Sequence, residues 1–344
     1  MTNKVIIAGH LEYGSSRNYD QVQAQFAHRK ENYYKNEIFV DEEEIFLPEE
    51  MAIEIPRKVL FCTDRQFLNS LNLLKLMTTF AISGDLNIWR LVGGKLQEHH
   101  YLEPKGDKSS TQAFLAGRQL LDGKGNEEAA KEKLTRAITK FDRHAQAYER
   151  RGYTNYRLGN MKEAIYDYEK SISINPIKPD PYYGLGMINL LQKKDYAAAA
   201  VNFEQVTKLS IPHQAIFWRG LVLWADCLVE LGKPEEAVSL YYRFTKRVQR
   251  HGEELDALDR RVSYTYGKLQ AAAGKHADAI SAFEAALTSP DGKKKTVKQE
   301  DILLQRALAG KAGDIRGWRK NLKEAADAGS SEAGNLLKQL RANA

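Results

Sequence analysis

The sequence predicts a mainly α-helical protein, in which about five stacked helical hairpins and a helical cap form a superhelix behind a small α+β domain. Three observations lead to this fold class. Residues 145–176 have the length and pattern of one complete helical hairpin. Related segments follow and precede it at a spacing of about 34 residues. Residues 1–104 lack this pattern and include strand-like segments, among them 51–55, where apolar and polar residues alternate.

Small and aromatic residues define the hairpin at 145–176. Gly152 and Ala164 are small enough to let two antiparallel helices approach closely, and Tyr148 and Tyr168 fill the space beside that contact. Gly159 lies in the turn, where we expect the left-handed conformation that ends a helix. One hairpin cannot bury its apolar stripe alone, so others must stack on it.

Neighbouring segments repeat this arrangement. Gly186 follows Gly152 by 34 residues, whereas Ala225 takes the small position of the fourth hairpin. The matching residues before and after 145–176 are Phe114, Gly117, Ala130, Leu134 and Ala137, then Tyr182, Gly186, Ala199 and Phe203, then Trp224, Ala225, Gly232, Ala237 and Tyr241, then Tyr266, Gly267, Gly274, Ala279, Phe283, Ala286 and Pro290, and last Gly313, Trp318, Leu322 and Ala325.

The residues that carry a resemblance to the tetratricopeptide repeat family are Tyr148, Gly152, Ala164, Tyr168 and Pro176. The segment departs from that family's pattern at Arg151 and Asn155, where Leu and Tyr are usual. The resemblance implies a right-handed superhelix whose first helices line a concave groove for a protein or peptide. It does not extend to the family members that clamp a C-terminal carboxylate, because the corresponding positions carry Leu115, Gln119, Arg150, Asp180 and Gly184.

Residues 1–104 predict about five strands around one helix. Strands are expected at 4–13, 32–40 and 51–55, with Pro56 marking an edge or a bend, and 57–62 continues as an apolar segment. Thr63 or Asp64 caps a helix that ends near Gly84. Strands at 86–92 and 95–101 flank Gly93 and Gly94, a hairpin signal. The apolar stripe of the helix is Phe67, Leu71, Leu74, Met77 and Ala81.

Composition sets the boundaries of the predicted parts. The α+β domain covers 1–104, a polar linker 105–111, the repeats 112–290 and the C-terminal helical cap 299–344. Lys193 and Lys194 add one residue to the turn of the third hairpin. A basic segment at 289–298 precedes the cap.

Charge is unevenly distributed. Residues 1–108 contain 13 Lys/Arg and 16 Asp/Glu, a net charge of −3. The remaining residues have a net charge of +9, so the whole chain has a net charge of +6. This favours acidic partners, or contact between the two parts. The acidic segment at 41–50 is interpreted as solvated, with docking onto basic helices as the alternative.

The chain shows no sign of a membrane span or a secretory leader, so we expect a cytoplasmic protein. No apolar run reaches the roughly 18 residues of a transmembrane helix, and the apolar stretch at 5–8 is short for a signal peptide. Cys62 and Cys227 lie far apart in apolar surroundings, which predicts two buried free thiols.

Catalytic and metal-binding motifs are missing from the sequence. It has no phosphate-binding loop, nucleophile elbow, zinc-protease motif or metal-spaced cysteine pair. His99 and His100 lie on opposite faces of a predicted strand, which is poor chelating geometry. We therefore expect a non-enzymatic protein without a metal or cofactor.

Two sets of side chains are candidate binding residues. The groove set combines Arg, Tyr and Met, which are typical of protein-binding surfaces; it consists of Glu149, Arg150, Tyr153, Arg157, Tyr183, Met187, Asp226, Tyr264 and Lys268. The basic face has helical spacing and could be solvated or could bind an anion, a peptide or nucleic acid; it consists of Arg243, Lys246, Arg247 and Arg250.

The sequence favours an interaction adaptor that holds a partner protein or peptide, possibly acidic, in the groove. A second hypothesis makes the N-terminal domain the binding module and the repeats its regulatory arm; a pocket lined by polar side chains beside the helix at 67–81 would favour it. A third, association with nucleic acid through basic helix faces, is the least favoured because neither exposed aromatics nor a nucleic-acid-binding fold is recognised.

Overall fold

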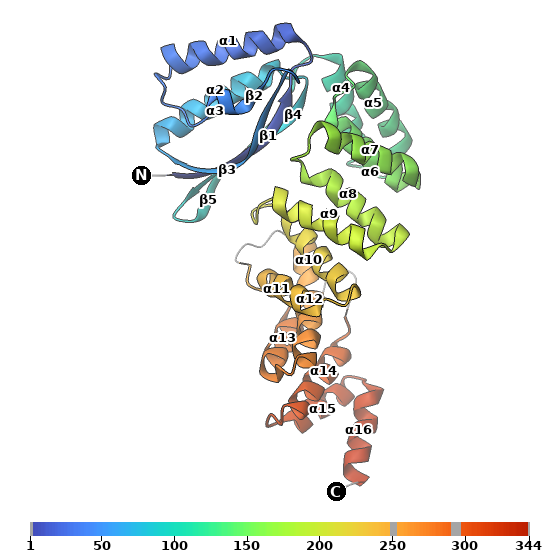
Figure 1. The fold of residues 1–344 in the computed structure, drawn as a ribbon. Helices are drawn as coiled ribbons and strands as arrows, with labels where there is room; N and C mark the ends of the chain where they lie inside the picture. Colours follow the sequence, from blue (N-terminus) through green and yellow to red (C-terminus); the bar gives the residue numbers. More distant parts are fainter. Residues whose placement is uncertain (1–2, 248–252, 290–296, 343–344) are drawn as a thin grey trace. The chain divides into compact units, whose positions relative to one another are not determined.

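A computed structural model describes residues 3–247, 253–289 and 297–342 (Figure 1). The chain forms two compact units, Met1–Ile188 and Asn189–Ala344. The first unit contains the N-terminal sheet domain together with the first hairpins, and the second contains the remaining helices. The division falls inside the third hairpin, whereas the boundaries predicted from composition lie at 104, 111 and 290.

A five-stranded antiparallel sheet forms the N-terminal domain, with strand order β2-β3-β1-β4-β5. The long strands β1 (Asn3–Glu12), β3 (Ala52–Cys62) and β4 (Ser83–Val92) form its centre, and β2 (Phe46–Leu47) is a two-residue edge. Strand β5 (Lys95–Leu102) pairs with β4 across the turn at Gly93 and Gly94. Both glycines have positive φ, 56° and 78°, as the predicted two-residue hairpin requires.

Two helices cover one face of the sheet (Figure 1). They are α1 (Ser16–Asn32) and α3 (Asp64–Phe80), and the short α2 (Glu42–Ile45) lies between them in the chain. Thr63 starts α3 with a capping box, because its hydroxyl accepts from the Gln66 amide at 3.2 Å and its own amide donates to Gln66 Oε1 at 3.0 Å. The core between helices and sheet includes Val5, Ile7, Leu11, Val22, Phe26, Ile53, Ile55, Phe67, Leu71, Leu74, Leu86 and Ile88.

The predicted strand at 32–40 is wrong. Helix α1 runs to Asn32, and Lys35 and Asn36 then take left-handed conformations that break any extended strand. Helix α1 itself was not predicted, because only Tyr19, Val22 and Phe26 of its residues are buried. The bend predicted at Pro56 is confirmed, since the pairing of β1 with β3 shifts register between Ile7 and Gly9, which face Lys58 and Ile55.

The hairpins of the first unit follow the predicted order. Helices α4 (Ser109–Leu120) and α5 (Glu127–Lys140) form the first, and α6 (Ala145–Leu158) and α7 (Met161–Ile174) form the second. Gly159 ends α6 with a φ of 83°, as predicted. Helix α8 (Pro179–Ile188) packs on α7.

Helices of the second unit continue the pattern. A π-helix, η1 (Asn189–Lys193), accommodates the extra residue at the third turn, where Lys194 has a φ of 53°. The helices that follow are α9 (Tyr196–Leu209), α10 (Ala215–Glu230), α11 (Pro234–Thr245), α12 (Glu253–Ala272), α13 (His276–Thr288), α14 (Gln299–Ala312), α15 (Trp318–Asp327) and α16 (Ser331–Ala342).

Small and aromatic residues meet inside the hairpins as the sequence predicts. A methyl group added at Gly152 would lie 3.0 Å from Cδ1 of Tyr168 and 3.3 Å from the carbonyl oxygen of Ala164. At Gly267 the nearest atom would be Cε1 of Phe283, at 2.7 Å. These contacts confirm the predicted register of the second and fifth hairpins. Pro290, predicted to end the fifth hairpin, lies outside the described residues, as does most of the basic segment at 289–298.

Candidate protein-binding surface

Glu149 and Arg150, the first two residues of the groove set, form an ion pair on α6 in which Glu149 is buried and Arg150 is partly exposed. The Glu149 side chain is 6% exposed, and its carboxylate lies 3.0 Å from Nε of Arg150. Burial raises the pKa of Glu149, and the guanidinium of Arg150 partly offsets that effect. In turn the Glu149 carboxylate raises the pKa of Arg150, with Asp180 of α8 adding to it. Glu149 therefore presents little surface to a partner.

Tyr153 and Arg157 form a cation–aromatic pair on α6, in which the Arg157 side chain is 23% exposed. Tyr153 is 37% exposed, and the Arg157 guanidinium lies 5.8 Å from the centre of its ring. Arg157 also pairs with Glu127 of α5, which holds its side chain in place. Tyr183 and Met187 on α8 are half-buried. An ordered aromatic ring with a cation beside it is a common anchor for protein partners.

The remaining groove residues belong to the second unit. Asp226 on α10 accepts from the Tyr241 hydroxyl at 2.6 Å and from Arg261 at 2.9 Å, so both contacts tie it to its own unit. On α12 the Lys268 ammonium lies 5.7 Å from the centre of the Tyr264 ring. Asp226 thus helps to join α10, α11 and α12, while Tyr264 and Lys268 form a second cation–aromatic pair.

Two of the four residues of the predicted basic face, Arg243 and Lys246, are exposed in the described part of the chain. Arg247, by contrast, is only 5% exposed at its side chain and pairs with Asp259 at 2.6 Å. Its guanidinium also lies 4.0 Å from the centre of the Phe244 ring. Arg247 is thus not part of an exposed cationic face, because its charge is used to join α11 to α12. Arg250 lies outside the described residues.

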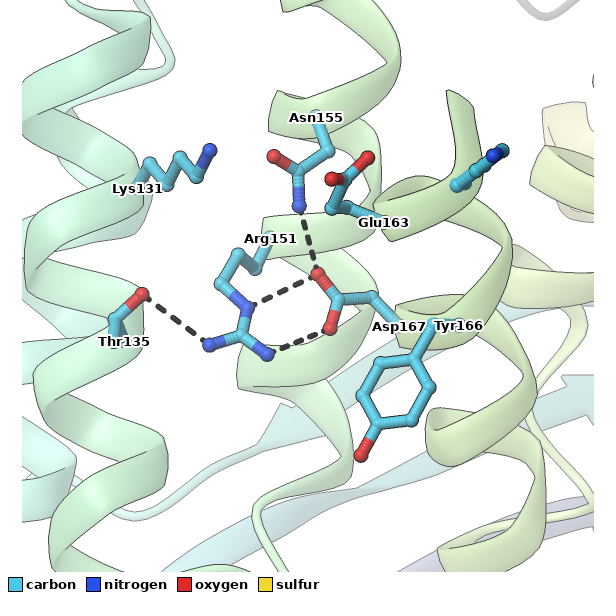
Figure 2. A pocket seen from close by; sticks show the side chains of 8 residues that line it. Lys131, Thr135, Arg151, Asn155, Glu163, Tyr166 and Asp167 are labelled. Atoms are coloured by element: carbon cyan, nitrogen blue, oxygen red, sulfur yellow. Dashed lines mark hydrogen bonds and ion pairs between the residues drawn. The ribbon is translucent and has the colours of Figure 1, made fainter. Parts of the chain in front are cut away.

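The departures from the repeat pattern, Arg151 and Asn155, meet at one carboxylate (Figure 2). Arg151 forms two hydrogen bonds to Asp167 of α7, at 3.0 and 2.7 Å, and Asn155 forms a third at 3.0 Å. Arg151 also donates to the Thr135 hydroxyl of α5 at 3.2 Å. These residues form part of a pocket of about 410 Å³ between the second helix of the first hairpin and the second hairpin.

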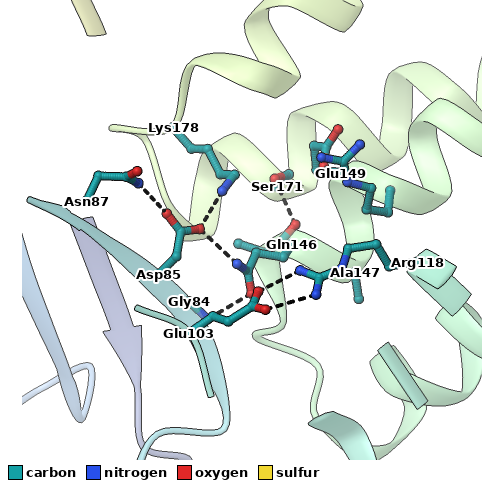
Figure 3. Close-up of polar contacts among 12 residues, drawn as sticks. Gly84, Asp85, Asn87, Glu103, Arg118, Gln146, Ala147, Glu149, Ser171 and Lys178 are labelled. Carbon is teal, nitrogen blue, oxygen red and sulfur yellow. Dashed lines mark hydrogen bonds and ion pairs between the residues drawn. The ribbon is translucent and has the colours of Figure 1, made fainter. Parts of the chain in front are cut away.

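A polar contact joins the sheet domain to the first helices of the hairpins (Figure 3). Gln146 of α6 accepts from the Gly84 amide at 3.0 Å and donates to Asp85 at 2.8 Å. Lys178, just before α8, pairs with the same carboxylate. Burial alone would lower the pKa of Lys178, but Asp85 more than offsets this and raises it. The bidentate pair of Arg118 with Glu103 adds a further contact between α4 and the segment after β5.

A second polar contact centres on Glu12 at the end of β1. Arg143, just before α6, donates to this buried carboxylate from Nη2 at 2.8 Å and also pairs with Glu50 at 2.7 Å. His10 lies 3.0 Å from Glu12 and 3.5 Å from Glu54. The acidic segment at 41–50 is therefore not wholly solvated, since Glu50 contacts the helical part of the chain and Glu44 pairs with Lys58.

A pocket of about 420 Å³ lies beside α3, at the start of the predicted linker. Polar and apolar side chains of α3, β5 and the residues that follow line it, and most of the exposed lining atoms are apolar. The lining residues are Lys75, Thr78, Thr79, Tyr101, Leu102, Glu103, Lys105 and Gly106. Burial raises the pKa of Tyr101, so the phenol stays protonated at neutral pH.

The predicted linker forms hydrogen bonds to the sheet domain, since Lys108 donates to the Phe80 carbonyl and Thr111 donates to the Ile82 carbonyl.

Three chemical features of the described residues bear on function. No three His, Cys, Asp or Glu side chains in this part of the chain converge on one point, as a metal site would require. None of the described helices combines the length and the apolar character needed to cross a bilayer. Cys62 and Cys227 are buried free thiols, which confirms the prediction.

Comparison with known families agrees with the geometry of the hairpins. The model of the tetratricopeptide repeat matches residues 119–180 and 222–293. Helical pairs with close small-residue contacts occur in both segments, at Gly152 and at Gly267. These two segments therefore contain tetratricopeptide repeats, as the sequence predicts. Repeats of this kind are scaffolds for protein interactions, because stacking creates an extended concave surface.

Individual relatives share shorter or more distant similarity. The human protein described as an SGT1 homolog is 36% identical over 84 residues, which is 24% of this chain and 23% of the relative. Its bovine counterpart is 34% identical over 83 residues, 24% of each chain. This chain thus spans about a quarter of the length of these curated relatives.

Solved structures with similar repeats include YrrB, described as a TPR protein with an unusual peptide-binding site. It is 19% identical with a TM-score of 0.48, over 60% of this chain and 97% of YrrB. PilF from Pseudomonas aeruginosa is 17% identical with a TM-score of 0.47, over 68% of this chain and 98% of PilF.

Sequence reasoning missed the residues that bind the sheet domain to the hairpins. Asp85, Gln146 and Lys178 are far apart in the chain, and each by itself looks like an ordinary surface residue. The one available signal is Asp85 directly before the predicted strand at 86–92, because a carboxylate that is buried there needs a partner.

Proposed function

We propose that the chain is a non-enzymatic interaction adaptor that holds a segment of a partner protein against the first helices of its repeats. The observation that carries this proposal is the cation–aromatic pair of Tyr153 and Arg157 on the first helix α6. A half-exposed ring held beside a paired guanidinium needs little ordering when a partner binds. Cytoplasmic location and an acidic partner belong to the same proposal.

Within this proposal we divide the groove residues by the contacts that they make inside the chain. Glu149 and Arg150 stabilise α6 next to the sheet domain, and Asp226 stabilises the second unit. Tyr153, Arg157 and Met187 of the first unit remain as contact residues in the proposal, and Tyr264 with Lys268 is a separate candidate pair in the second unit. Tyr183 has contacts of its own within the chain and is assigned a supporting role.

A comparison of two tyrosine variants tests the proposal. Partners captured from native lysate by the whole chain are quantified and then tested individually with Tyr153→Ala and Tyr33→Ala. Tyr33 is 65% exposed and lies outside the groove set, so it is a matched control. We expect Tyr153→Ala to weaken a direct partner by about 2 kcal/mol and Tyr33→Ala to leave its affinity unchanged. Equal affinities of Tyr153→Ala and the wild type for every partner would exclude the groove.

A second candidate function is favoured by the pocket beside α3. Its position meets the condition set by the rival hypothesis, in which residues 1–104 bind the ligand or partner. Lys75 and Lys105 supply cationic groups to this pocket, and Thr78 and Thr79 supply hydroxyls. The rival hypothesis predicts that the double variant Lys75→Ala with Lys105→Ala no longer captures the partner. It also predicts that the Tyr153→Ala variant still captures it. These point variants are preferable to deleting residues 1–104, because deletion would also remove the contacts of Asp85 and Glu12 with the hairpins.

A further inference from the structure

We propose that the pocket between α5, α6 and α7 is a second binding site, and that it takes the carboxylate side chains of an acidic peptide segment. None of its lining residues belongs to the groove set, so this proposal does not depend on the function proposed above. The residues that carry it are Lys131, Thr135, Arg151, Lys162, Glu163 and Asp167.

The floor of the pocket is polar where the repeat pattern would make it apolar. Arg151 and Asn155 replace the usual Leu and Tyr, and both bind Asp167, which is 1% exposed. A buried ion pair generally stabilises a fold no better than apolar packing of the same size. Stability alone therefore gives no reason for these residues, whereas a polar floor suits a polar ligand.

Hydrogen-bond geometry leaves the floor without a free negative charge. Both carboxylate oxygens of Asp167 accept from Arg151, and Asn155 donates to one of them as well. The third nitrogen of the Arg151 guanidinium points to Thr135, whose hydroxyl lies at the exposed side of the pocket (Figure 2). These bonds neutralise the charge of Asp167, and the ligand-facing hydroxyl on this side of the pocket is that of the exposed Thr135.

Charge at the rim favours an anion. Lys131 on α5 and Lys162 on α7 line the pocket, and in the described part of the chain neither has an ion-pair partner. Glu163 is the one rim carboxylate of the lining residues, so the rim carries a net charge of +1. Figure 2 shows Lys131 and Thr135 reaching from α5 toward Arg151 on α6. Ammonium groups and a hydroxyl around an open pocket match a carboxylate.

Fluorescence anisotropy with a labelled hexaglutamate peptide tests the assignment on the whole chain. Two variants change the rim charge in opposite directions without touching the floor. Lys131→Gln with Lys162→Gln should weaken binding by about fivefold or more, and Glu163→Gln should strengthen it by about twofold. Both effects should shrink as salt is added, because screening weakens exposed charges.

The matched control is Lys133→Gln with Lys170→Gln, which removes equal charge from α5 and α7 outside the pocket. Its affinity for hexaglutamate should equal that of the wild type. Equal losses in the pocket and control variants would mean that binding follows net charge and would overturn the site. An affinity for hexaglutamate that stays unchanged in the pocket variants would also overturn the site.

Two further probes separate the sources of an anion. Inorganic phosphate should compete weakly with hexaglutamate, and a single-stranded oligouridine should bind the pocket variant as it binds the wild type. Tight phosphate binding without hexaglutamate binding would overturn the carboxylate assignment. A loss confined to oligouridine would overturn the peptide assignment in favour of nucleic acid.

Discussion

Arg150, which the sequence predicts to contact a partner, also makes a contact that supports the fold. Its guanidinium lies 3.0 Å from the buried Glu149 carboxylate. We expect Arg150→Ala to lower the free energy of unfolding by about 2 kcal/mol, because it leaves Glu149 buried without a cation; the figure allows for the 37% exposure of the Arg150 side chain. From the sequence alone this substitution looks neutral for stability.

A second variant checks the physical cause. Adding Glu149→Gln to Arg150→Ala removes the unpaired charge and should recover part of the loss. Urea denaturation of both variants measures the difference. Glu149→Gln alone is measured as well. If the loss of unfolding free energy in the double variant equals the sum of the losses in the two single variants, the two side chains do not interact and this explanation is wrong.

His10 makes stability depend on pH. Burial lowers the pKa of this imidazole, but hydrogen bonds and charge from Glu12 and Glu54 outweigh burial and raise it to about 9, above the ordinary 6.5. The folded state therefore holds a proton that the unfolded state releases. The stabilisation is complete below pH 6.5 and is lost as the pH rises toward 9, a decrease of about 3 kcal/mol.

Urea denaturation at pH 6.5 and pH 9 checks this prediction, with His10→Gln as the comparison. The variant should lose the pH dependence, although it is less stable at pH 6.5. His144 does not affect this comparison. Burial lowers its pKa to about 3, so its contribution to the free energy of unfolding changes only below pH 6.5. The same decrease in both proteins would assign the effect to other groups.

At the scale of elements, glycines set how closely the helices pack. A methyl group added at Gly184 would overlap the Tyr168 ring, which is 3% exposed, so α8 and α7 would have to separate. Gly184→Ala should lower the free energy of unfolding by roughly 1 to 3 kcal/mol through this overpacking. The thermal midpoint of the whole chain measures it.

Gly334 on α16 is the matched control with the opposite sign. A methyl group there would meet no atom within 4 Å. Gly334→Ala should therefore raise stability by about 0.5 to 1 kcal/mol, since alanine favours the helix. A Gly184→Ala variant that is as stable as Gly334→Ala would show that α7 and α8 are not in close contact.

At the scale of the whole molecule, the sheet domain supports the first hairpins rather than being joined to them by a free linker. Removing residues 1–104 would expose Gln146 and Lys178 and leave Arg143 without Glu12. We expect the amides of α4 and α6 to exchange with solvent faster in the fragment 105–344 than in the whole chain. Helix α13 in the second unit is the internal control and should exchange at the same rate in both. Unchanged protection in α4 and α6 would mean that the hairpins fold independently.

Local pattern in the sequence determined the hairpins, their register and most strands. Small and aromatic residues at repeat spacing are sufficient, because helices within a hairpin are close in sequence and their packing follows the helical period. The capping box at Thr63 and the turn at Gly93 and Gly94 are equally local. The sequence does not predict helix α1, because its buried stripe is narrow. The segment after α1 resembles a strand in the sequence, because it is rich in aromatic and β-branched residues.

Only the tertiary structure decided how the polar residues are used. Asp85 meets Gln146 and Lys178, and Glu12 meets Arg143, across sequence separations of 61 to 131 residues. The charge of a residue is visible in the sequence, but its partner depends on which surfaces the folded chain brings together. For this reason the sequence shows the charges of Glu149 and Arg247 but not the ion pairs that hold them. The pocket around Asp167 likewise exists only because α5, α6 and α7 lie side by side.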